Sequence, residues 1–78
     1  MSDWSEEIAV ATAEAERLQA QEAVAEARFD VVYAQSEADG APERAPASEE
    51  FHLWMAARKA TDAAWGSWSI VMDSKPQP

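Results

Sequence analysis

The sequence has no cysteine, only two glycines and no apolar run of membrane-spanning length. Without cysteine, no disulfide can brace this chain of 78 residues, and such an absence is typical of a reducing compartment. The longest uncharged stretch in the apolar C-terminal part covers ten residues, 63–72, whereas a membrane-spanning helix needs about 20. The N-terminal residues are acidic and lack the apolar segment of a secretory signal. We therefore expect a single cytoplasmic domain with no membrane span.

Basic residues are also scarce, with 6 against 15 acidic ones and a net charge of −9. The imbalance is concentrated in residues 1–39, which hold ten acidic and two basic side chains, whereas residues 48–78 have a net charge of −1. Such a surface disfavours direct binding to nucleic acid or to an anionic membrane. We expect a protein partner, and the negative charge favours a basic one. The same charge is also explained by a need for solubility alone.

No complete catalytic or cofactor motif is present, so we predict neither an enzyme nor a bound cofactor. The single histidine, His52, has no evident serine partner, and there is no glycine-rich phosphate loop. One pattern resembles a metal site: Glu49 and His52 have the Glu-x-x-His spacing of di-iron carboxylate bundles, with Glu37 as a possible facing ligand. Glu49 equally suits the first turn of a helix. A di-iron oligomer is therefore one functional hypothesis, and it ranks below two others that depend on the apolar stripes and the acidic residues.

The chain divides into two helical segments. The first covers residues 4–38, with Asp3 as N-cap, Glu6 three residues further on, and an interior rich in alanine, glutamate, glutamine, leucine and arginine. Asp39 and Gly40 form its stop signal, because glycine readily adopts the left-handed conformation that ends helices.

The second helix is expected over residues 48–73, with Ser48 as N-cap. Residues 39–47 contain two prolines and a glycine, which predicts a loop rather than a third helix. Gly66 lies inside the second helix, where we expect a local bend or close packing. Residues 74–78 form a tail. The fold class is therefore all-α, an antiparallel two-helix hairpin that dimerisation or a partner would complete into a helical bundle.

Each predicted helix carries two apolar stripes at helical spacing, and one antiparallel neighbour covers only one of them. In the first helix, one stripe is Ile8, Ala11, Ala15, Leu18, Ala25, Phe29 and Val32, interrupted by Glu22. The other is Val10, Ala13, Ala20, Val24, Ala27, Val31 and Ala34, interrupted by Arg17. In the second helix, the stripes are Phe51, Trp54, Trp65, Trp68 and Met72, and Leu53, Ala57, Ala60, Ala64, Trp68 and Val71. The uncovered stripes predict a homo-oligomer or a subunit of a complex.

Four tryptophans are many for a chain of this length. Trp4, Trp65 and Trp68 lie near the helix ends that an antiparallel hairpin brings together, which predicts an aromatic cluster there. We expect Trp65 and Trp68 to be largely buried, against Trp4 or against a partner. Tryptophan and methionine are also enriched at protein interfaces. The predicted interface residues are Phe51, Trp54, Trp65, Trp68, Met72 and Trp4.

Glu22, Glu26 and Asp30 form an acidic row with a spacing of about 6 Å, similar to that of phosphates along a DNA strand. The first functional hypothesis is a non-enzymatic interaction module: an adaptor, a small phage-type component or a subunit of an assembly. The second is an acidic inhibitor, in which this row mimics nucleic acid and blocks a basic nucleic-acid-binding protein.

Overall fold

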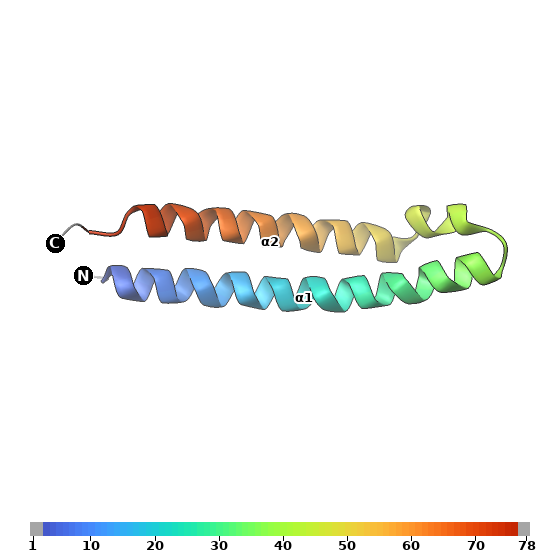
Figure 1. Cartoon of the computed structure of the whole chain (residues 1–78), viewed down its shortest axis with the longest axis horizontal. Coiled ribbons are helices and arrows are strands. Elements are labelled where there is room, and N and C mark those ends of the chain that lie inside the picture. Colours follow the sequence, from blue (N-terminus) through green and yellow to red (C-terminus); the bar gives the residue numbers. More distant parts are fainter. Residues whose placement is uncertain (1–2, 77–78) are drawn as a thin grey trace.

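The computed structural model describes residues 3–76, which form a rod with extents of 61 × 16 × 15 Å. Helix α1 covers Trp4–Ala38, a short 3-10 helix η1 covers Pro42–Ala47, and helix α2 covers Glu49–Asp73. The two long helices run antiparallel and side by side, so the start of α1 and the end of α2 lie at the same end of the rod (Figure 1). The predicted all-α helical hairpin is confirmed.

Local sequence signals explain where both helices begin. The Asp3 carboxylate accepts a hydrogen bond from the Ser5 N–H at 3.1 Å, which caps α1. The Ser48 hydroxyl oxygen accepts one from the Phe51 N–H at 3.1 Å, which caps α2. Each cap satisfies a backbone donor that the first helical turn leaves unpaired.

Helix α1 ends in a Schellman motif around Gly40. The Ala41 N–H donates to the Ser36 carbonyl at 2.9 Å, and the Gly40 N–H donates to the Glu37 carbonyl at 3.0 Å. This geometry needs a residue in the left-handed region, and Gly40 has φ of +72°. The predicted stop signal is therefore confirmed.

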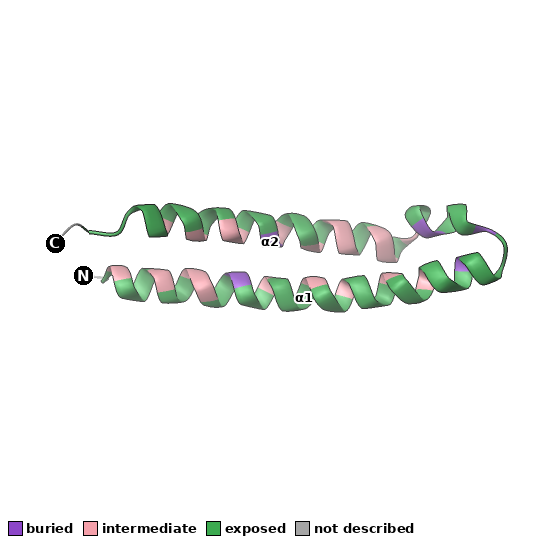
Figure 2. Cartoon of the chain, in the orientation of Figure 1, coloured by how far each residue is buried: buried purple, intermediate pink, exposed green. Residues whose placement is uncertain are grey.

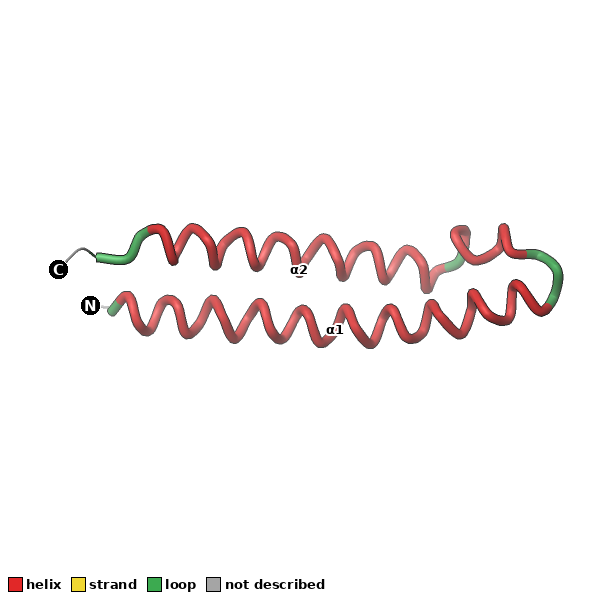
Figure 3. Tube along the Cα trace, in the orientation of Figure 1, coloured by secondary structure: helices red, strands yellow, loops and turns green. Residues whose placement is uncertain are grey.

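The connector differs from the predicted plain loop, because Pro42–Ala47 forms a 3-10 helix (Figure 3). Pro42 stands at its first position, where the missing N–H of proline costs nothing and the fixed φ suits a helical turn. The prediction of a loop without a third helix was therefore wrong, although this helix is a short 3-10 helix and not an α-helix.

Gly66 does not interrupt α2, which is continuous from Glu49 to Asp73. A Cβ atom built at Gly66 would meet nothing within 4 Å. The expected close packing at this glycine was therefore wrong.

The core of the hairpin is thin. The half-buried residues lie on the facing sides of the two helices, and the outward sides are exposed (Figure 2). In the described chain, the buried apolar residues are Ala15, Ala41 and Ala45, and no larger side chain is fully buried. Two helices alone cannot enclose a large side chain on all sides.

Candidate protein-interaction surface

Three indole groups tie α2 to α1. The indole N–H of Trp4 donates to the Val71 carbonyl at 2.7 Å, and that of Trp68 donates to the Thr12 hydroxyl at 2.9 Å. The indole N–H of Trp65 donates to the side-chain oxygen of Gln19 at 3.2 Å. These bonds join residues that are far apart in sequence, so they fix how the two helices align.

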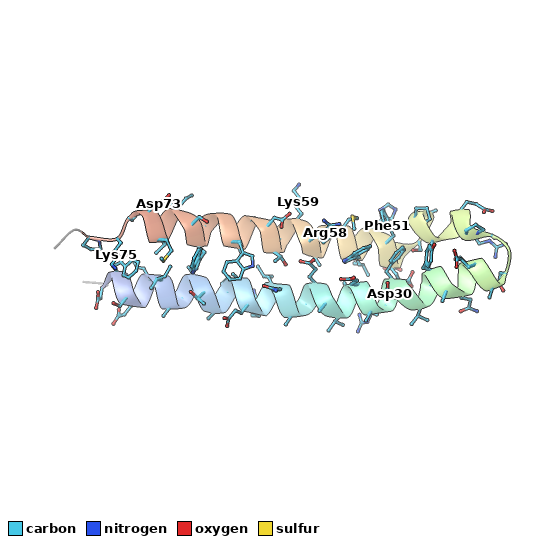
Figure 4. The ribbon with its side chains drawn as sticks, viewed as in Figure 1. Asp30, Phe51, Arg58, Lys59, Asp73 and Lys75 are labelled. Atoms are coloured by element: carbon cyan, nitrogen blue, oxygen red, sulfur yellow. The ribbon has the colours of Figure 1, made fainter. Side chains whose placement is uncertain are left out.

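The predicted tryptophan cluster is only partly formed. Trp65 and Trp68 pack edge to face, with ring centroids 5.5 Å apart. Trp4 lies instead beneath the Lys75 ammonium group, which is 5.6 Å from its ring centroid and reaches back toward the start of α1 (Figure 4). All three tryptophans are half-buried, because the neighbouring helix covers part of each side chain.

A second aromatic group lies toward the turn. Phe29 stacks on Trp54 with centroids 5.1 Å apart and lies 5.5 Å from Phe51. Arg58 covers Trp54 at 5.7 Å from the ring centroid. The indole nitrogen of Trp54 is buried without a hydrogen-bond partner. Of the six predicted interface residues, five are therefore half-buried within the hairpin, and Met72 is exposed.

Phe29, Thr12 and Gln19 were not among the predicted site residues. Phe29 was visible as a large residue on the first apolar stripe of α1. Nothing in the sequence indicated that Thr12 and Gln19 would accept indole hydrogen bonds, because that pairing depends on the register between the helices.

The two stripes predicted for α2 are in fact one broad face. Ala57, Ala60, Ala64 and Val71 are half-buried together with the aromatic residues, and Leu53 is the one member of the second stripe that is exposed. The prediction of an uncovered second stripe on α2 was therefore wrong. The two stripes share Trp68, which places them side by side around the helix.

The second stripe of α1, by contrast, is entirely exposed; we call it the outer stripe. Its members are Val10, Ala13, Arg17, Ala20, Val24, Ala27, Val31 and Ala34. Val10, Val24 and Val31 are 70%, 52% and 66% exposed. Each member lies two residues after a position of the stripe that faces α2, which rotates it by about 200° around the helix. The outer stripe therefore faces directly away from α2.

An open groove runs between α1 and α2 at the open end of the hairpin. It has a volume of about 470 Å³ and is lined by Glu6, Glu7, Val10, Ala11, Glu14 and Val71. A neighbouring hollow of about 360 Å³ shares Ala11 and Glu14 and is also lined by Leu18, Ala60, Ala63, Ala64 and Ser67. The small side chains make an apolar floor beside an acidic rim, and Val10 is the one outer-stripe residue that borders either hollow.

The acidic row does not present three outward carboxylates. Glu26 and Asp30 are exposed, but Glu22 is half-buried on the side of α1 that faces α2. Elsewhere on α1, Glu14 forms an ion pair with Arg17, with an N–O distance of 2.6 Å. The hydrogen bond from Arg17 lowers the pKa of the Glu14 carboxyl below its usual value.

The three candidate metal ligands are not brought together. Glu37, Glu49 and His52 are all exposed, and His52 packs against the Phe51 ring with centroids 5.9 Å apart. Within residues 3–76, no group of three or more histidine, aspartate or glutamate residues has a metal-binding arrangement. Glu37 instead acts on Tyr33: a hydrogen bond to this carboxylate raises the pKa of the Tyr33 phenol.

Comparison with known proteins gives no match to a family model, to a curated protein or to a solved structure. In the described part of the chain, neither long helix is apolar enough over a sufficient length to cross a membrane.

Proposed function

We propose that this chain is a non-enzymatic protein–protein interaction module, a structural or assembly component that presents the outer stripe of α1 to another helix. The observation that carries the proposal is the exposure of this stripe, which extends from Val10 to Ala34 with only Arg17 as a charged interruption. A continuous exposed apolar face of this kind marks an interaction site in a natural protein. The thin core supports the same conclusion, because a small helical domain gains stability from a further packing partner.

The acidic-inhibitor alternative has less support. A row of carboxylates that mimics phosphates must face solvent along its whole length, and Glu22 is half-buried toward α2. The net charge of −9 still favours a partner with basic residues around its apolar contact surface.

The test compares two substitutions of exposed β-branched residues. Val24→Glu places a charge in the outer stripe, and Ile70→Glu places the same charge on α2 at a side chain that is 69% exposed. We expect wild type and Ile70→Glu to self-associate or to retain the same partner from the source cells, and Val24→Glu to lose that association. Circular dichroism should show equal helix content in all three proteins. If Val24→Glu associates as wild type does, or if wild type binds nothing, the proposed function is wrong.

A further inference from the structure

The outer stripe has a regular seven-residue repeat. Val10, Arg17, Val24 and Val31 occupy one heptad position, and Ala13, Ala20, Ala27 and Ala34 occupy the position three residues later. Apolar residues at these two positions form the seam of a coiled coil. Here the seam alternates between a larger and a very small residue over 25 positions, and all of its members are exposed.

We propose that the occupant of the outer stripe is a second copy of this chain, with the two α1 helices packed antiparallel about a twofold axis near Glu22. This inference depends on the proposed function and specifies its partner. The antiparallel arrangement places a large residue opposite a small one in every layer. The layers are Val10 with Ala34 of the second copy, Ala13 with Val31, Arg17 with Ala27, and Ala20 with Val24.

The alternative parallel pairing fits the same stripe poorly. It stacks valine on valine and alanine on alanine in successive layers, so the valine layers hold the helices apart and the alanine layers leave voids. It also stacks Arg17 on its own copy inside the seam, which brings two like charges together. In the antiparallel pairing, the two Arg17 residues are about 15 Å apart along the axis, because each is five residues from the centre.

Charges beside the seam favour the antiparallel pairing on one flank. Glu14, Gln21 and Arg28 follow each other at seven-residue intervals along this flank and are all exposed. In an antiparallel pair, this flank faces its own copy. Glu14 then lies near Arg28 of the second copy, twice by symmetry, and Gln21 lies near its equivalent at the axis.

The other flank contains a like-charge approach, from Glu16 to Asp30 of the second copy, which also occurs twice by symmetry. Arg17 is paired with Glu14 on the opposite flank and does not offset this approach. The antiparallel pairing is therefore favoured by the seam and by the Glu14–Arg28 flank. The resulting dimer is a row of four helices with the two α1 helices in the centre. The helices form a row rather than a compact bundle, because the outer stripe faces directly away from α2.

Single cysteines distinguish the two orientations, since the chain has none of its own. Gln21→Cys lies at the proposed axis, so a short bifunctional maleimide should crosslink it to its own copy. Gln35→Cys occupies the same flank 14 residues further on and serves as the matched control. In the antiparallel dimer, the two thiols of this control variant are roughly 40 Å apart. Crosslinking of Gln21→Cys alone supports the proposal. A parallel pair treats the two positions alike, so crosslinking of both variants, or of neither in a dimeric chain, overturns it.

Sedimentation of the uncrosslinked chain completes the test. We expect wild type and Ile70→Glu to be dimers, and Val24→Glu to have a dimer Kd higher by roughly tenfold or more. Arg28→Glu should weaken the dimer, and Glu14→Arg combined with Arg28→Glu should restore it. A monomeric wild type that still binds a different protein through Val24 would overturn the second-copy proposal but leave the proposed function intact. A monomer with no such partner would overturn both.

Discussion

The indole N–H of Trp68 donates a hydrogen bond of 2.9 Å to the hydroxyl of Thr12, a residue 56 positions earlier in the chain. The same hydroxyl donates to the Ile8 carbonyl at 2.7 Å, one helical turn back along α1. Thr12 therefore acts as acceptor toward α2 and as donor within its own helix. The hydrogen bond to the Ile8 carbonyl holds the Thr12 hydroxyl in an orientation in which its oxygen can accept from the Trp68 N–H.

Thr12→Val should weaken the hairpin, because it keeps the shape of the side chain and removes the acceptor for Trp68. A half-buried donor left without a partner costs about 1 kcal/mol. Urea unfolding at fixed protein concentration measures this loss. In a Trp68→Phe background, where the donor is already gone, the same substitution should cost much less. An equal cost in both backgrounds would contradict a role for this hydrogen bond.

Substitution of each of the two glycines by alanine should change the stability of the protein, with opposite signs at the two positions. Gly40→Ala should destabilise the protein by about 1–2 kcal/mol, since φ at this position is +72° and an L-residue is strained there. Gly66→Ala should stabilise it by roughly 0.5–1 kcal/mol, because Gly66 lies inside α2 and its added methyl group has free space. Thermal unfolding of the two variants under matched conditions checks both signs. A loss of stability in Gly66→Ala would show that this glycine serves close packing after all.

The helix ends were predictable because their causes are local. Asp3, Ser48 and Gly40 each act within a few residues of the helix end that they define. The opposite placement of the two α1 stripes was also predictable, since it follows from helical periodicity alone. The exposure of the outer stripe agrees with that pattern.

The register between the helices was not predictable in the same way. The antiparallel arrangement of the helix ends suggested that Trp4 would join Trp65 and Trp68, but the Trp4 indole binds the Val71 carbonyl instead. Which face of α2 meets which turn of α1 depends on packing along the whole seam. That packing also merges the two α2 stripes into one face, which agrees with their sharing Trp68.

Tyr33 should titrate above the ordinary tyrosine pKa of about 10, because its phenol is hydrogen-bonded to Glu37 and its deprotonated form would face that carboxylate. Since the folded-state pKa is raised, the associated stability is present below the ordinary pKa and is lost as the pH rises through the folded-state value. Ultraviolet absorbance follows this transition directly, because Tyr33 is the single tyrosine. Glu37→Gln should bring the pKa down toward its ordinary value. Glu16→Gln, which removes the same charge elsewhere on α1, should leave it raised.

Glu22 and Glu26 lie one turn apart in the acidic row but should respond differently to substitution by leucine. Glu22 is half-buried and interrupts the α1 stripe that faces α2, whereas Glu26 is exposed. Glu22→Leu should therefore raise the free energy of unfolding by about 1 kcal/mol, because it adds apolar surface where α2 covers it. Glu26→Leu should change it by less than about 0.5 kcal/mol. Urea unfolding of both variants makes the comparison. Equal effects would mean that both carboxylates face solvent, which would restore the intact acidic row that nucleic-acid mimicry requires. A gain confined to Glu22→Leu would instead leave that row with two outward carboxylates.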